Sequence, residues 1–360
     1  VSENPKTTPD TLSYIAFERI PRLNKLARSD MAADIVRNEN ATLKTVSTLF
    51  GNEYINRSDL RRIASFTNSS EILDLVAKYS KTNNNDAITV IQNEATLPKT
   101  LLHIAKTHTD PHVYRNLLRN RNTPASALAI LFRWFYDKAY SYSSEFSRLL
   151  EHPNAMPSFF RELSEDEDEV LRGMAAYSTK TPPEVLAVLA KDHVKSIRRD
   201  VAKNRNTPPE VLSVLSKEES FLVKANVARN LSAPPEVLSV LSKEERDIRR
   251  IVAQNPSTPP ATLAELAKDE IDIVRSDVAL NKSTPSEVLN ILLKDKYEPA
   301  VFYAVDRLRS RGELDEAKSK DPKTGTGKKP KGSGRRLYTD ENPKDTVSVE
   351  FSSAAAIRRT

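Results

Sequence analysis

The chain has 360 residues, of which 38% are hydrophobic, 6% aromatic and 29% charged, with 7 glycines and no cysteine. The missing cysteine excludes disulfide bonds, thiolate metal sites and a cysteine nucleophile. No apolar run approaches the roughly 18 residues of a membrane span, and the low glycine content argues against a turn-rich all-β protein.

The formal net charge of +6 is concentrated in one segment of the chain. Residues 318–336 contain eight basic residues and one acid, so they carry +7 and leave −1 for everything else. The body of the protein is therefore electrically balanced, and the basic character belongs to the tail.

A short sequence recurs along the chain at a nearly constant interval. Residues 207–212 read Thr-Pro-Pro-Glu-Val-Leu, and similar words recur at intervals of 26, 26, 25 and 26 residues. A fixed period of this size indicates a repeat array, here of about eleven units. The clear copies have their first proline at Pro182, Pro208, Pro234, Pro259 and Pro285, and weaker copies lie near Pro9, Thr42, Ser70, Pro98, Pro124 and Pro157.

The residue types in this recurring segment are typical of a helix N-terminus. Thr207 is predicted to be the N-cap, with prolines at the first two helical positions and Glu210 completing a capping box. Ala233 replaces the threonine in one copy, at an expected loss of about 1 kcal/mol.

Each unit contains two segments with helical spacing of apolar residues. Val211, Leu212 and Leu215 form one stripe, which predicts a helix of roughly ten residues. A shorter segment follows, such as residues 274–279, which suits two turns of α- or 3₁₀-helix. Neither segment can bury its stripe alone, whereas stacked neighbours can. The predicted fold is an all-α solenoid of two-helix repeats.

Residues 248–259, which read Ile-Arg-Arg-Ile-Val-Ala-Gln-Asn-Pro-Ser-Thr-Pro, resemble the unit of the variant leucine-rich repeat family. The resemblance covers residues 166–310 and extends from about residue 90. It implies alternating α- and 3₁₀-helices in a right-handed superhelix without strands. One family member carries an iron–sulfur module, which a chain without cysteine cannot hold. HEAT-type repeats, which are helical pairs of longer period, are the nearest alternative.

The pattern divides the chain into three parts. Residues 1–165 are predicted to form degenerate repeats, and residues 166–318 to form regular repeats closed by a polar capping helix over 298–318. Residues 319–360 are predicted to be a disordered basic linker, with a strand-like stretch that could begin a further module. Residues 1–5 resemble the second half of a repeat unit, so further repeats are expected upstream.

Two rows of polar residues recur with the repeat. An asparagine four residues before the cap proline could form a ligand ladder, but bonding to the turn backbone is the favoured interpretation. A basic residue ten before the proline is the candidate binding stripe, and its alternative is an ion pair with the acid five or six residues earlier. The asparagines are Asn120, Asn204, Asn230, Asn255 and Asn281; the basic residues are Arg172, Arg198, Lys224, Arg249 and Arg275.

Aromatic residues interrupt the period between 133 and 146. The candidate aromatic patch comprises Trp134, Tyr136, Tyr140 and Tyr142, with Phe135 and Phe146 nearby. Exposed, these side chains would anchor a partner. The favoured alternative is that they fill a wide joint between two stacks.

No motif predicts catalysis, a cofactor or a metal. His103, His108 and His112 with Asp110 lack the convergent geometry that a zinc site needs, and residues 165–169 lack the features of an EF-hand. The glycine-rich phosphate loop and the common hydrolase motifs are also missing.

The sequence therefore predicts a non-enzymatic, cytoplasmic scaffold that binds a protein partner along its repeats, with no membrane partner or small-molecule substrate. Nucleic-acid binding through the basic stripe and tail is the alternative. A helical-repeat enzyme of the base-excision glycosylase kind is the third hypothesis, and Arg133, Trp134 and Asp137 are its thin basis.

Overall fold

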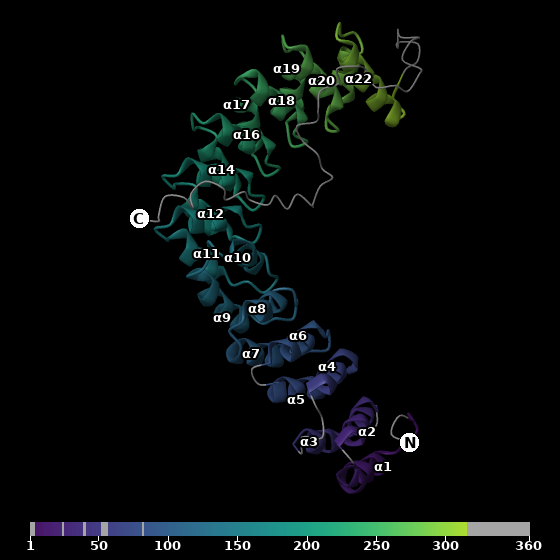
Figure 1. Ribbon diagram of the computed structural model, residues 1–360. Coiled ribbons are helices and arrows are strands. Elements are labelled where there is room, and N and C mark those ends of the chain that lie inside the picture. The colour runs from purple at the N-terminus through teal and green to yellow at the C-terminus, as the bar shows by residue number, and fades with distance from the viewer. Residues whose placement is uncertain (1–3, 24, 39–40, 52–56, 81–82, 315–360) are drawn as a thin grey trace. The chain divides into compact units, whose positions relative to one another are not determined.

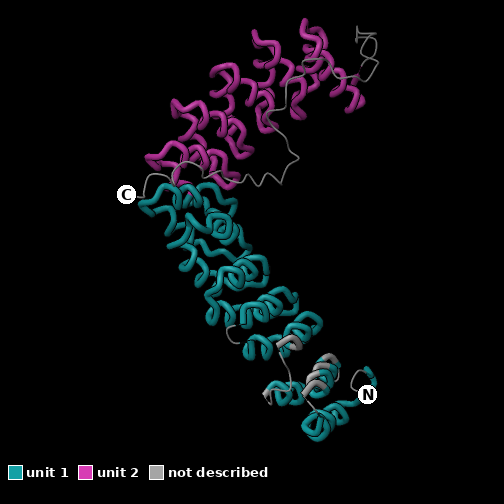
Figure 2. The backbone as a smooth tube through the Cα atoms, viewed as in Figure 1, with its two compact units in different colours: residues 1–185 teal, residues 186–360 magenta. Residues whose placement is uncertain are grey.

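The computed structural model describes residues 4–23, 25–38, 41–51, 57–80 and 83–314. Helices and turns account for these residues, and no strand occurs among them, so the all-α repeat solenoid predicted from the sequence is confirmed (Figure 1). The chain forms two compact units, residues 1–185 and 186–360 (Figure 2). The regular repeats were predicted to begin at residue 166, and the predicted tail, residues 319–360, lies outside the described residues.

Unit 1 is a stack of helices of uneven length (Figure 1). Its first helix continues into a π-helix, Ile15–Arg19, and a 3₁₀-helix, Ile20–Arg22. Its α-helices are α1 Pro9–Tyr14, α2 Lys25–Arg37, α3 Leu43–Gly51, α4 Arg57–Phe66, α5 Ser70–Ser80, α6 Asn84–Gln92, α7 Pro98–Thr107, α8 Pro111–Leu117, α9 Ala125–Tyr136, α10 Ser143–Leu150, α11 Pro157–Ser164 and α12 Glu169–Tyr177.

Unit 2 alternates two kinds of helix with little variation. The first helix of each repeat has seven residues and the second has nine, except for α22 with 13, and both kinds are α-helical. The predicted order of lengths was therefore wrong. The helices are α13 Pro183–Leu189, which spans the boundary between the units, α14 Lys195–Lys203, α15 Pro209–Leu215, α16 Phe221–Arg229, α17 Pro235–Leu241, α18 Arg246–Gln254, α19 Pro260–Leu266, α20 Asp272–Leu280, α21 Ser286–Leu292 and α22 Glu298–Ser310.

The core of unit 2 lies between the two rows of helices. Each second helix packs directly on the next second helix along the chain, and each first helix packs against the second helices beside it. The predicted stripe on α15 is buried, with Leu212 and Leu215 fully so. Burying one such leucine contributes on the order of 2 kcal/mol, which a seven-residue helix can obtain only from its neighbours.

The recurring threonine does not cap the helix that follows it. Pro208 is the N-cap of α15, with ψ at 147°, and the helix begins at Pro209. A proline pushes the residue before it out of the α conformation, so the helix cannot begin earlier than the second proline. Thr207 therefore stands one residue too far upstream, and the predicted capping box is wrong.

The threonine hydroxyl instead satisfies the end of the preceding second helix. Thr207 donates to the carbonyl oxygen of Val201 at 2.5 Å, and the same bond from residue i to residue i−6 recurs along both units. The other bonds, all at 2.5–2.6 Å, are Thr96 to Val90, Thr123 to Leu117, Thr181 to Ala175, Thr258 to Val252 and Thr284 to Val278.

The last described helix, α22, is shorter than the helix predicted over residues 298–318. α22 ends at Ser310, where Gly312 adopts a φ of 71° that favours glycine. The amide of Gly312 donates to the carbonyl of Arg309, and that of Glu313 to the carbonyl of Leu308. These two bonds form a Schellman motif, which terminates the helix before the predicted residue 318.

Candidate binding surface

The recurring asparagines tie each repeat to the one before it. The amide nitrogen of Asn255 donates to the carbonyls of Ala228 and Asn230 at 2.7 and 3.2 Å, while its oxygen accepts from the amide of Ser257 at 2.8 Å. Asn230 and Asn281 make the equivalent three bonds, and Asn120 bonds the carbonyl of Ile91. The oxygen of Asn204 accepts from the amide of Asn206. This geometry favours the structural role over a ligand ladder.

Other residues take over where a repeat lacks the asparagine. In unit 1, His152 lies 3.1 Å from the carbonyl of Asn120 through Nε2 and accepts from the amide of Asn154 through Nδ1. Burial lowers the pKa of His152, so the neutral ring is favoured. In the last repeat of unit 2, Arg307 donates to the carbonyl of Leu280 at 2.6 Å.

The basic row forms an ion-pair ladder with the acids of the following repeat. Arg198 bonds both carboxylate oxygens of Glu218, at 2.8 and 3.1 Å, and also donates to the carbonyls of Asp192 and His193. The sequence suggested pairing with the acid five or six residues earlier, but the carboxylate comes from 20 residues later. The other pairs in unit 2 are Lys224–Glu244, Arg249–Asp269 and Arg275–Asp295, each with a contact at 2.7 Å.

These pairs neutralise the charge of the candidate binding stripe within unit 2. The side chains of Arg198, Lys224, Arg249 and Arg275 are only 16–19% exposed. In unit 1, Arg172 is buried and donates to the carbonyls of Asp166 and Glu167. The geometry therefore favours the ion-pair alternative, and leaves little of this row available to a partner.

Most of the candidate aromatic patch packs inside unit 1. Trp134 lies edge-on to Tyr114 at 5.3 Å and near Tyr142 at 5.2 Å, measured between ring centroids. Trp134, Tyr136 and Tyr142 are half-buried, whereas Tyr140 is 62% exposed. Phe132, Phe135 and Phe146 are fully buried beside them, so the cluster fills the joint around α9 and α10.

The remaining candidates differ in their surroundings. Arg133 forms an ion pair with Glu162, and Lys138 lies 4.6 Å over the ring of Trp134. His108 is buried, whereas His112 is exposed. No group of three or more metal-ligating side chains is present in the described part of the chain.

The structure shows an exposed aliphatic row that the sequence analysis missed. Four first helices of unit 2 carry a valine or isoleucine six positions after the cap proline, 51–62% exposed to solvent. With 3.6 residues per turn this position lies on the flank of the helix, off the buried stripe. An apolar residue recurring off the stripe was the signal that could have revealed it. The aliphatic row is Val188, Val214, Val240 and Ile291.

A row of lysines follows the aliphatic row three residues later. All five lysines are exposed, and none of them makes an ion pair with any residue that the structure describes. Because each lies two residues after the last residue of a first helix, they also suit the negative end of the helix dipole. The lysine row is Lys191, Lys217, Lys243, Lys268 and Lys294.

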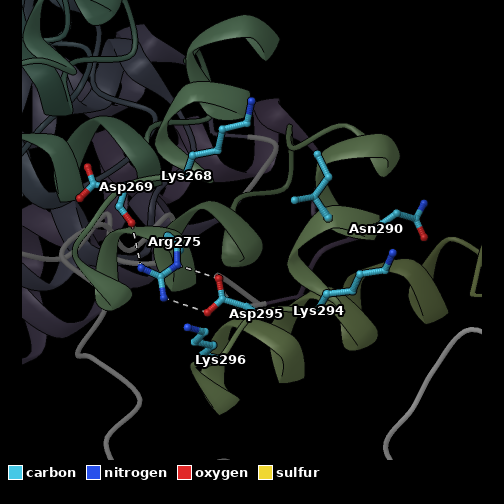
Figure 3. A pocket seen from close by; sticks show the side chains of 8 residues that line it. Lys268, Asp269, Arg275, Asn290, Lys294, Asp295 and Lys296 are labelled. Atoms are coloured by element: carbon cyan, nitrogen blue, oxygen red, sulfur yellow. Dashed lines mark hydrogen bonds and ion pairs between the residues drawn. The ribbon is translucent and has the colours of Figure 1, made fainter.

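The two rows meet at a shallow depression of about 780 Å³ in unit 2. Figure 3 shows Arg275 between Asp269 and Asp295, with Lys268 and Lys294 extending away from this ion pair. Lys268, Ile291 and Lys294 bring both rows to its wall. Its lining residues are Lys268, Asp269, Arg275, Asn290, Ile291, Lys294, Asp295 and Lys296.

Comparison with known proteins agrees with this repeat geometry. The leucine rich repeat variant family matches residues 246–271, which comprise α18 and α19. These residues are therefore similar to one unit of that repeat family. The resemblance seen in the sequence is thereby confirmed for this repeat.

The chain was also compared with solved structures and with curated proteins. The chain is similar to a solved structure described as a leucine-rich repeat variant with a novel repetitive protein structural motif, at 24% identity and a TM-score of 0.40. That match covers 60% of this chain and 83% of the other. No curated protein matches the chain. No helix in the described ranges is long and apolar enough to cross a membrane.

Proposed function

We propose that this protein is a non-enzymatic scaffold that binds another protein along the first helices of unit 2. The aliphatic row carries the proposal. Val188, Val214, Val240 and Ile291 are more than half exposed and recur at one position of the repeat. Single exposed apolar residues are ordinary, but a row of them along stacked helices, interrupted by the exposed Glu265 of α19, offers an apolar surface to a partner.

The polar rows support this choice of surface by being engaged elsewhere. The asparagines bond the preceding repeat, and the basic row pairs with the next one. Their recurrence therefore has a structural cause. The exposed valines have none, because an exposed β-branched residue is a poorer helix former than alanine.

Nucleic-acid binding is the second candidate. It draws on the basic segment 318–336, which lies outside the described residues, and on counterion release as the source of affinity. The neutralised ion-pair ladder weakens it, since phosphates would have to displace carboxylates that already hold each arginine.

The test compares protein capture by three forms of the full chain: wild type, Val214→Ser with Val240→Ser, and a control with Arg205→Ser and Lys282→Ser. The control residues are exposed and lie away from the aliphatic row. Capture is measured by quantitative mass spectrometry after nuclease treatment. We expect a set of proteins that wild type and control retain equally and that the valine variant retains at least about tenfold less, equivalent to a loss of about 1.4 kcal/mol. Equal retention by all three forms would contradict the proposal.

A further inference from the structure

The depression beside Ile291 is lined by four basic residues and two acidic ones. Asp269 and Asp295 line it, but each carboxylate already bonds an arginine at 2.7 Å, Arg249 and Arg275 respectively. Lys268, Lys294 and Lys296 also line it, and none of the three has an ion-pair partner among the described residues. Three positive charges therefore remain uncompensated around one hollow.

This excess is particular to the last repeat. In three of the preceding loops an exposed acid follows the lysine by two residues, and in the first loop His193 stands at that position. The three acids are Glu219, Glu245 and Glu270. In the last repeat the equivalent position is Lys296. The helix dipole accounts for a lysine at the end of each first helix, but not for a second lysine in the loop beyond it.

The walls of the hollow also indicate which anion it accepts. Ile291 is 51% exposed and lines it, and no aromatic side chain does. Single-stranded nucleic acid is held by aromatic stacking as well as by charge, and a phosphate backbone would leave the isoleucine uncovered. A peptide segment that combines carboxylates with aliphatic side chains satisfies both features.

We infer that the protein partner binds through an acidic segment, whose carboxylates contact the lysine triad of Lys268, Lys294 and Lys296 while an aliphatic side chain packs on Ile291. This inference rests on the proposed function and specifies the chemistry of the partner. The triad supplies charge attraction and orientation, and the aliphatic row supplies apolar contact.

The test uses a random dodecapeptide display library selected on the full chain, followed by fluorescence anisotropy with the enriched peptide. Two variants are compared, Lys294→Gln with Lys296→Gln and a matched control, Lys217→Gln with Lys243→Gln. Both remove two exposed lysines, but only the first changes the triad. A version of the peptide with every Asp and Glu changed to Asn and Gln, and a single-stranded oligonucleotide of equal charge, complete the set.

We expect the enriched peptides to contain both acidic and aliphatic residues. Affinity should fall at least about tenfold in the triad variant and for the amidated peptide, stay within about twofold in the control, and weaken as salt is raised. Enriched peptides without excess acid, equal binding by the two variants, or tighter binding of the oligonucleotide would each overturn the inference.

The two tests fail separately. Loss of partner capture in the valine variant, with no acid-dependent peptide binding, would support the scaffold proposal and contradict the inference of an acidic segment. Acid-dependent peptide binding at the triad, with partner capture unchanged in the valine variant, would remove the proposed scaffold surface instead.

Discussion

The side-chain amide of Asn255 lies 3.2 Å from the carbonyl oxygen of Asn230, the asparagine at the same position of the preceding repeat. Asn281 repeats the contact with the carbonyl of Asn255 at 2.9 Å. Each asparagine therefore orients the backbone from which the next one takes its acceptor. These bonds hold every repeat in the same register on the repeat before it, which explains why asparagine recurs at a fixed position.

Replacing Asn255 with alanine should destabilise unit 2 by about 3 kcal/mol, because the three hydrogen bonds that its side chain makes to backbone groups are lost. Chemical denaturation monitored by circular dichroism measures the change. Asn290→Ala is the control, since Asn290 is exposed and its change should stay within about 0.5 kcal/mol. Similar values for the two variants would contradict a structural role for the ladder.

The threonine bond predicts a stabilising substitution. Ala233 is 4% exposed and stands where Thr207 and Thr258 donate to a second-helix carbonyl. Ala233→Thr should raise the free energy of unfolding by up to about 1 kcal/mol, and Thr207→Val should lower it by a similar amount. If Ala233→Thr lowered the denaturation midpoint, the position would lack room for the hydroxyl in its bonded orientation.

We expect the ion-pair ladder to stabilise unit 2 through the pairing of opposite charges rather than through the basic side chains alone. Glu218→Ala leaves Arg198 without its carboxylate and should lower the free energy of unfolding by about 1–2 kcal/mol. The double variant Arg198→Met with Glu218→Met should cost less than the sum of Arg198→Met alone and Glu218→Met alone. Asp247→Ala removes an exposed pair with Arg246 and should change stability by less than about 0.5 kcal/mol. Strict additivity in this double-mutant cycle would show that the pair is energetically silent.

The aromatic cluster should behave as core rather than as a patch. Phe146→Ala should cost about 3–5 kcal/mol, because the ring is fully buried among other aromatic side chains. Tyr140→Ala removes a ring that is 62% exposed and should cost less than about 1 kcal/mol. Loss of protein capture with Tyr140→Ala, without loss of stability, would instead restore the predicted patch at that residue.

His152 predicts a stability that falls in mild acid. Burial lowers its pKa below the ordinary 6.5, so the unfolded chain binds the proton first as the pH falls. Stability is therefore full above 6.5 and declines below it, by at most about 1.4 kcal/mol per pH unit from this group. The pKa of the buried His108 is lowered in the same direction.

The substitution His152→Asn separates the contribution of His152 to this pH dependence from that of His108. Asparagine occupies this position in several other repeats, such as Asn120 and Asn255, so the variant should fold and lose part of the slope between pH 7 and 5. Denaturation midpoints measured across that range report it. An unchanged slope would show that His152 titrates as freely in the folded chain as in the unfolded one.

The sequence by itself determined the period of the repeats and the helical spacing within each unit. These properties depend on contacts between residues a few positions apart. Leu212 and Leu215 share a helix face whatever the neighbouring repeat contributes. Even so, local chemistry assigned Thr207 to the wrong helix, because Pro208 occupies the N-cap of α15 and the Thr207 hydroxyl donates to the carbonyl of Val201 in the preceding helix.

Only the tertiary structure decided which residues remain exposed and free. The carboxylate that pairs with Arg198 lies 20 residues later in the chain, and the acceptor of the Asn255 amide lies 25 residues earlier. These distances are set by how one repeat stacks on the next, and no pattern within a repeat specifies that register. The same stacking engages the basic row and leaves Val214, Val240 and Ile291 in solvent, which moves the candidate surface onto the first helices.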